Sequence, residues 1–103
     1  MSPFQTKIKE QYQNDGFLVL NLISLSASGF PDLLALKDGR VVFIECKEGG
    51  DKLSPIQKYK IRLLIKFGFE AFAIHAKKGV IYPLKHKKNE KNSPLDSAID
   101  AGF

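Results

Sequence analysis

The spacing of apolar residues along the chain predicts two amphipathic helices. The sequence Ser-Pro-x-Gln occurs at residues 2–5 and again at 54–57. Each occurrence fits a helix start in which serine caps the helix, proline lies in the first turn and glutamine completes a capping box. We expect the first helix to end at Asn14-Asp15-Gly16 and the second to reach about Phe67, where Gly68 ends it.

Each predicted helix has one apolar face that can pack on a sheet. In the first helix this face is formed by Phe4, Ile8 and Tyr12. A second, narrower apolar strip on the other helix, Ile61 and Ile65, is either a dimer seam or further core. We expect the main core face of that second helix to consist of Ile56, Tyr59, Leu63, Leu64 and Phe67.

Shorter apolar runs between turn residues predict five strands. They cover residues 17–23, 33–37, 41–47, 69–75 and 80–82. The resulting order, α-β-β-β-α-β-β, is typical of an α/β domain in which a mixed β-sheet carries flanking helices. We assign residues 1–83 to this domain and the lysine-rich, polar residues 84–103 to a C-terminal tail.

The pair Asp38-Gly39 between two of these strands is a strong signal for a two-residue hairpin turn. Such a turn pairs Lys37 with Arg40 and therefore places Asp32 directly opposite Glu45, on one face of the sheet. Because side chains alternate along a strand, Lys47 shares that face with Glu45. A three-residue loop would instead move Asp32 and Glu45 to opposite faces.

Two opposed carboxylates in an otherwise apolar hairpin repel each other unless a cation compensates. Lys47 could compensate alone, at an ordinary strand end that meets water. A divalent cation between Asp32 and Glu45 would compensate better, and carboxylate oxygens without a nearby His or Cys suit Mg²⁺ or Mn²⁺.

Composition and charge narrow the class of protein. A chain of 103 residues with 44% hydrophobic residues fits one folded domain. Its net charge of +5 indicates a polyanionic partner, most simply nucleic acid, although solvated lysines give the same balance. No apolar run approaches the roughly 20 residues of a membrane span.

Cysteine usage bears on the compartment. The single cysteine, Cys46, excludes an internal disulfide and any Cys-based zinc site. Residues 1–10 also lack the apolar stretch of a secretory signal, so we expect a cytoplasmic protein, in a bacterial or virus-infected host cell.

Three segments together resemble the PD-(D/E)xK nuclease signature. They are Gly29-Phe30-Pro31-Asp32, Glu45-Cys46-Lys47 and Ser54-Pro55-Ile56-Gln57. More narrowly, the chain is similar to the VRR-NUC (virus-type replication-repair nuclease) branch, over roughly residues 2–79. The resemblance implies a restriction-endonuclease-like core and a homodimeric, Mg²⁺-dependent, structure-specific DNA endonuclease that resolves Holliday junctions in repair and recombination.

The resemblance also implies a role for each matching residue. Asp32 and Glu45 ligate the metal, the Cys46 backbone carbonyl adds a ligand, and Lys47 positions or activates the attacking water. Gln57 is either part of the active site or only the partner of Ser54 in a capping box. The acidic residue that the family often has in its first helix is matched here by Gln5, with Glu10 a turn later; we expect Glu10 to be solvated.

Several cations are candidate nucleic-acid contacts: Lys58, Arg62, Lys77 and Lys78, with further lysines in the tail. The alternative is a solvated helix face and a solubilising tail. Rival functions are a flap- or end-processing nuclease, a restriction-type nuclease, and a non-catalytic nucleic-acid-binding module on the same fold.

Overall fold

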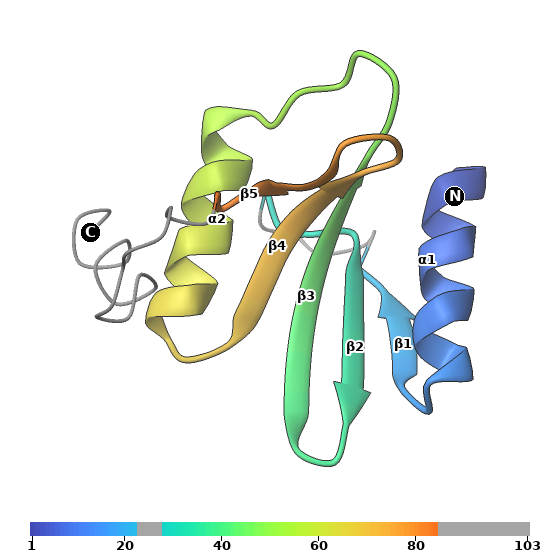
Figure 1. The fold of residues 1–103 in the computed structure, drawn as a ribbon. Coiled ribbons are helices and arrows are strands. Elements are labelled where there is room, and N and C mark those ends of the chain that lie inside the picture. The colour runs from blue at the N-terminus through green and yellow to red at the C-terminus, as the bar shows by residue number, and fades with distance from the viewer. Residues whose placement is uncertain (23–27, 85–103) are drawn as a thin grey trace, which may run out of the picture.

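The computed structural model describes residues 1–22 and 28–84. Within these residues, two helices and five strands follow one another in the predicted order, α-β-β-β-α-β-β (Figure 1). Their bounds are α1 Pro3–Asn14, β1 Leu18–Asn21, β2 Leu33–Lys37, β3 Arg40–Lys47, α2 Pro55–Lys66, β4 Glu70–His75 and β5 Gly79–Tyr82. Most of the predicted tail lies outside the described residues, so the boundary after residue 83 stays a prediction.

The five strands form one sheet in the order β1-β2-β3-β4-β5. Strands β3 and β4 are parallel, and every other neighbouring pair is antiparallel. The parallel pair requires a crossover, which α2 provides. The predicted α/β class with a mixed sheet and flanking helices is therefore confirmed.

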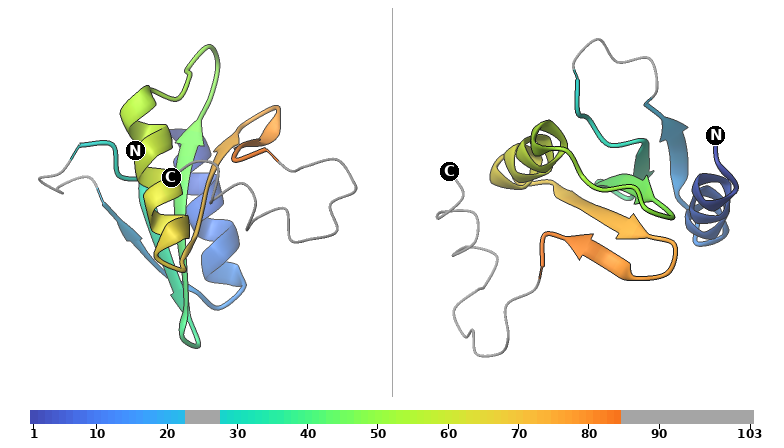
Figure 2. Two further views of the ribbon diagram at one scale, coloured as in Figure 1. Left: turned by 90° about the vertical axis from the view of Figure 1, so that its left-hand side faces the viewer. Right: turned by 90° about the horizontal axis from the view of Figure 1, so that it is seen from above.

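The two helices lie on opposite faces of the sheet (Figure 2). Helix α1 covers the β1–β3 side, where Ile8 packs with Val19, Leu33 and Ile44 in one apolar cluster. Helix α2 covers β4 on the other face, where Ile61 packs with alanines of β4 in a second cluster. The alternate residues of the central strands point into the two clusters in turn, so the sheet is apolar on both faces.

The hairpin between β2 and β3 has the predicted two-residue turn. Asp38 and Gly39 both have positive φ, 50° and 78°, as the tight turn requires. Lys37 pairs with Arg40, and the register continues without a slip to Leu33 opposite Ile44. The three-residue alternative is therefore excluded.

The predicted core face of α2 is confirmed at Leu64, which is 9% exposed, and is wrong at three other positions. Ile56, Tyr59 and Phe67 are 43%, 51% and 69% exposed, whereas Ile61 is fully buried and Ile65 is 9% exposed. The strip that we treated as a dimer seam or further core is thus the main core face. The buried residues Ile61, Leu64 and Ile65 follow Gln57 at spacings of four, seven and eight, so Gln57 lies on the same arc of the helix.

Neither helix is long and apolar enough to cross a membrane, as judged over residues 1–22 and 28–84.

Candidate active site

Three chain segments meet at one end of the sheet. Strand β3 ends there at Lys47, α2 begins there, and the segment that leads into β2 passes beside them (Figure 1). This arrangement follows from the antiparallel β2–β3 hairpin and from the crossover that starts where β3 stops. It brings the polar residues of three separate sequence motifs to the same place.

Asp32 immediately precedes β2. Its backbone carbonyl accepts a hydrogen bond from Leu22 N–H at 2.8 Å, which continues the β1–β2 pairing by one step. Its carboxylate Oδ2 accepts a hydrogen bond from Cys46 N–H at 3.1 Å. Asp32 is therefore held against the end of β3 beside Glu45, as the hairpin register predicts.

Glu45 is the buried carboxylate of the group, with only 4% of its surface exposed. Its Oε2 accepts a hydrogen bond from Gln57 Nε2 at 3.2 Å and lies 3.4 Å from Lys47 Nζ. Its Oε1 is buried and has no hydrogen-bond partner among the described residues. A buried carboxylate oxygen without a hydrogen-bond partner lowers the stability of the fold unless a ligand binds to it.

Burial, followed by the nearby Asp32 charge, raises the pKa of Glu45 from 4.5 to about 7, and Lys47 only partly offsets them. The Lys47 side chain is itself only 12% exposed. The pair thus sits in a partly dry site where a further positive charge would be stabilising.

Gln57 forms the predicted capping box and also contacts Glu45. Its Oε1 accepts a hydrogen bond from Ser54 N–H at 2.9 Å, and its own N–H donates to Ser54 Oγ at 3.2 Å, which is a complete capping box. The remaining amide nitrogen donates to Glu45. One side chain therefore both starts α2 and fixes the orientation of the carboxylate.

Gly29 sets the distance between the Asp32 segment and α2. Its φ is +83°, and a Cβ built there would lie 2.8 Å from Ile56 Cγ1 and 2.9 Å from the Ile56 carbonyl oxygen. Only glycine allows the backbone before Asp32 to approach the first turn of α2 this closely.

The donor set fits a hard divalent cation. Asp32 lies close enough to Glu45 for its charge to raise the pKa of that carboxylate, and Glu45 Oε1 lacks a partner among the described residues. No third His, Cys, Asp or Glu joins them within residues 1–22 and 28–84, so further ligands would have to be water or main-chain oxygens. Two carboxylates, with water and main-chain oxygens filling other positions, suit Mg²⁺ better than zinc.

The Cys46 thiol takes no part in this site. Its side chain is buried in the cluster under α1, on the face opposite Glu45. Burial raises the pKa of the thiol to about 12, so it stays protonated and is a poor metal ligand.

The remaining candidates lie farther out. Gln5 is occupied in the capping box of α1, and Glu10 is exposed, as expected. Lys58, Lys77 and Lys78 are exposed, and Arg62 is partly buried. The tail lysines that we also predicted to contact DNA follow Leu84 and lie outside the described residues.

His75 is a functional-site neighbour that the sequence did not identify. It pairs with Lys47 across β3 and β4 and is 5% exposed. Its Nδ1 accepts a hydrogen bond from Lys77 N–H at 3.1 Å, so its Nε2 carries the proton and donates to the Gly49 carbonyl at 2.8 Å. His75 thus connects the loop after Lys47 to the β4–β5 turn. The two residues of this contact, His75 and Gly49, are 26 positions apart in the sequence, so no local pattern predicts it.

Comparison with known proteins gives a consistent result. The family model of the VRR-NUC domain matches residues 5–78. A protein of Acyrthosiphon pisum secondary endosymbiont phage 1, named "Putative nuclease p44", is 32% identical over 60 residues, which cover 57% of this chain and 64% of that protein. The match therefore spans slightly less than two thirds of that relative.

Two solved structures share the fold. A VRR-NUC domain superposes with a TM-score of 0.60 at 33% identity, over 68% of this chain and 77% of the other. Hjc of Archaeoglobus fulgidus, a Holliday junction resolvase, superposes with a TM-score of 0.54 at 22% identity, over 70% and 64% of the two chains. Since the family model spans Asp32, Glu45, Lys47 and Gln57 within one continuous match, this chain belongs to the VRR-NUC nuclease family.

Proposed function

We propose that this protein is a metal-dependent endonuclease that hydrolyses DNA phosphodiester bonds, with branched DNA such as the four-way Holliday junction as its substrate. The observation that carries the proposal is the buried Glu45 carboxylate, which lies beside Asp32 and Lys47 and keeps one oxygen without a partner. The family supports nuclease chemistry, and the fold shared with a Holliday junction resolvase supports the branched substrate.

Asp32, Glu45 and the Cys46 carbonyl would hold the metal, with Mg²⁺ as the expected ion and Mn²⁺ able to replace it. When bound, such an ion lowers the pKa of a water ligand and neutralises charge that develops on the phosphate. The Gln57 amide keeps Glu45 Oε2 engaged at 3.2 Å, so Oε1 would be available to hold such an ion.

Lys47 supplies a positive charge beside the reacting phosphate. Its ammonium lies 3.4 Å from Glu45 Oε2 in a partly buried place, where electrostatic stabilisation is larger than in water. We assign it two roles: it orients the attacking water, and it stabilises the negative charge that grows on the phosphoryl oxygens.

DNA is held by cations around this end of the molecule. Lys58 and Arg62 on α2, with Lys77 and Lys78 in the β4–β5 turn, are positioned by elements that border the site. The net charge of +5 supports electrostatic attraction of DNA, and such contacts weaken steeply as salt is raised. We place this activity in the cytoplasm.

We also propose that two copies of the chain form a homodimer, because paired cuts on two strands need two active sites. The apolar side chains that α2 leaves exposed, Ile56, Tyr59 and Phe67, support a homodimer. Light scattering of the wild type is expected to give twice the chain mass, and Phe67→Asp is expected to shift the protein toward monomer.

The decisive experiment is cleavage of a labelled four-way junction with Mg²⁺, Mn²⁺ or EDTA, beside linear duplex and flap substrates. We expect metal-dependent paired nicks on the junction. Cutting of flaps or linear DNA instead would keep the Asp32–Glu45–Lys47 site but reject the junction. Salt-sensitive binding without any cutting would favour the non-catalytic module.

A further inference from the structure

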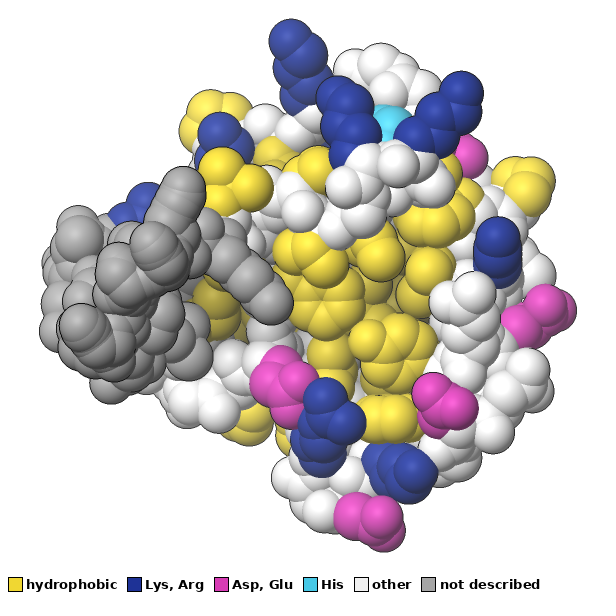
Figure 3. All heavy atoms as spheres, viewed as in Figure 1, with side chains coloured by type: hydrophobic (Ala, Val, Ile, Leu, Met, Phe, Trp, Pro, Cys, Tyr) yellow, Lys and Arg dark blue, Asp and Glu magenta, His cyan; other side chains and the backbone are white. Residues whose placement is uncertain are grey.

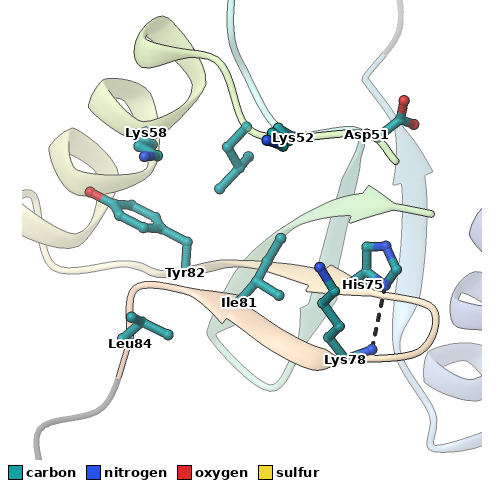
Figure 4. Close-up of a pocket in the computed structure, with 9 residues that line it drawn as sticks. Asp51, Lys52, Lys58, His75, Lys78, Ile81, Tyr82 and Leu84 are labelled. Atoms are coloured by element: carbon teal, nitrogen blue, oxygen red, sulfur yellow. Dashed lines mark hydrogen bonds between the residues drawn. The ribbon is translucent and has the colours of Figure 1, made fainter. Parts of the chain in front are cut away.

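An open pocket lies on the α2 face of the sheet, beside the candidate active site (Figure 4). Its volume is about 500 Å³, and three segments line it: the loop that follows Lys47, the first turn of α2, and strands β4 and β5 with their turn. This volume lies in the range of small-molecule sites, roughly 300–1,000 Å³.

The pocket and the candidate active site flank the first turn of α2. Gln57 reaches Glu45 on β3, and the next residue, Lys58, lines the pocket. On the sheet, Lys47 is the parallel partner of His75, which also lines the pocket. The pocket therefore lies next to the candidate active site both along α2 and across the sheet.

The pocket combines cations with an apolar wall. Lys52, Lys58 and Lys78 come from the three different segments; Lys58 lies beside Tyr82 and Lys78 beside Ile81 (Figure 4). Lys58 Nζ lies 5.8 Å from the centre of the Tyr82 ring. Asp51 is the one carboxylate of the lining, and its side chain points away from Tyr82 in this view.

The wider charge pattern agrees with an anionic ligand. Lys and Arg side chains predominate at the top of Figure 3, with an acidic side chain at their edge, whereas the opposite end of that face mixes both signs of charge more evenly. His75 accepts hydrogen bonds from Lys77 N–H and Lys78 N–H, at 3.1 and 3.4 Å. The backbone that carries these two lysines is therefore fixed to the end of β4.

We propose that this pocket binds one unpaired nucleotide of the DNA substrate, with its base against Tyr82 and Ile81 and its phosphate between Lys58 and Lys78; this rests on the proposed nuclease function. An aromatic ring beside lysines is the usual platform for single-stranded nucleic acid. Duplex DNA would present only phosphates here, because its bases are stacked and cannot reach the Tyr82 ring. Branch points and flaps supply bases that are free to do so.

The test uses 2-aminopurine, a fluorescent base, placed at an unpaired position next to the cleavage site and at a paired position as the matched substrate. Binding is measured in EDTA, so that cleavage does not interfere. The wild type is expected to quench the unpaired probe only. Tyr82→Ala is expected to weaken binding of this DNA about 5- to 150-fold, the usual loss for one stacked base, and to abolish the quench, whereas Tyr82→Phe retains both.

A second pair of variants tests the phosphate contacts. For single-stranded DNA, each neutralised phosphate contributes about 0.7 to the slope of log affinity against log salt. Because the pocket is proposed to hold one phosphate between these two lysines, the double variant Lys58→Ala with Lys78→Ala is expected to flatten this slope by about 0.7. Lys7→Ala, which removes the same kind of charge from the exposed side of α1, is expected to leave the slope nearly unchanged.

The outcomes distinguish failure of the pocket proposal from failure of the nuclease proposal. A protein that cuts DNA but shows equal quenching of both probes, or equal affinity in Tyr82→Ala, overturns the pocket and leaves the nuclease intact. A protein that binds no DNA of any kind overturns both. If the protein quenches the free 2-aminopurine mononucleotide as strongly as the probe within the oligonucleotide, the substrate assignment is overturned and the pocket is a mononucleotide site. Thermal melting of Tyr82→Leu, which keeps an apolar side chain, detects any general loss of folding.

Discussion

The same four-residue pattern starts both helices, but only one of the two starts takes part in the candidate chemistry. In α1, Gln5 N–H donates to Ser2 Oγ at 3.1 Å and Ser2 N–H donates to Gln5 Oε1 at 3.3 Å. In α2, the matching distances are 3.2 and 2.9 Å. The local structure is therefore nearly identical.

The difference lies in what stands opposite the glutamine. Gln57 lies at the end of β3 and donates a hydrogen bond to Glu45. Gln5 belongs to α1, on the opposite face of the sheet, and among the described residues its side chain bonds only within its own cap. The two regions teach that short-range sequence determines where a helix begins, and that topology determines whether its capping residue becomes part of a site. The following predictions test this contrast.

The largest effect is expected from breaking the charged group that Gln57 joins. Asp32→Asn and Lys47→Ala are each expected to lower the single-turnover cleavage rate by at least about 10²–10³-fold, because each removes charge at the reacting phosphate or its metal. Glu10→Gln is the matched control: it alters an exposed acid on α1 and is expected to keep the full rate. Cleavage that survives either of the first two changes would remove these residues from the mechanism.

The next effect concerns pH and stability. Because the pKa of Glu45 rises from 4.5 to about 7 on folding, the folded chain binds more protons than the unfolded chain between these values. The free energy of unfolding without metal is therefore expected to fall by about 3 kcal/mol as pH rises from 4.5 to 7, and to level off above. Urea titrations at several pH values measure this free energy of unfolding.

Two comparisons sharpen this result. Glu45→Gln is expected to give a flat profile in the same window, because its amide does not titrate. Saturating Mg²⁺ is expected to reverse the loss in the wild type, since the ion binds the ionised carboxylate. A wild-type profile as flat as that of the variant would show that Glu45 ionises normally.

A direct comparison of the two glutamines comes third. Gln57→Ala and Gln5→Ala each remove half of a capping box, so we expect similar small losses of stability. Only Gln57→Ala is expected to lower the cleavage rate as well, by about 10- to 100-fold, which is usual for a residue that orients a metal ligand. Equal rates in the two variants would mean that the Gln57–Glu45 contact has no functional role.

The smallest effect is expected at the serines. Ser2→Ala and Ser54→Ala are each expected to cost about 1 kcal/mol of unfolding free energy, measured by urea denaturation. The two values should agree closely, because the caps have the same geometry. Ser54→Ala should in addition slow cleavage a few-fold, since Gln57 loses its anchor; a much larger stability loss at one serine would contradict the equivalence of the caps.

The features that the sequence predicted well are those that depend on neighbouring residues. The Asp38-Gly39 turn determines the β2–β3 register by itself, and this register places Asp32 beside Glu45. Both helix starts likewise follow from four adjacent residues.

The features that the sequence did not predict depend on distant contacts. Apolar side chains surround most of α2, so periodicity could not decide whether Ile56 or Ile61 faces the sheet; packing on β4 decides it. The contact of His75 with Gly49 joins two turns, and nothing local to either residue indicates it. For Gln57, the sequence offered a cap or a site role as alternatives. Because an amide has two ends, the same side chain completes the cap and also donates a hydrogen bond to Glu45.

Gly29 has a consequence for how this protein tolerates mutation. A single methyl group at this position would collide with Ile56 and push the Asp32 segment away from the helix that carries Gln57. In a saturation scan scored for DNA cleavage, Gly29 would therefore behave like a catalytic position although it has no functional group. Gly50, where an added Cβ meets nothing within 4 Å, would accept many residues in the same scan.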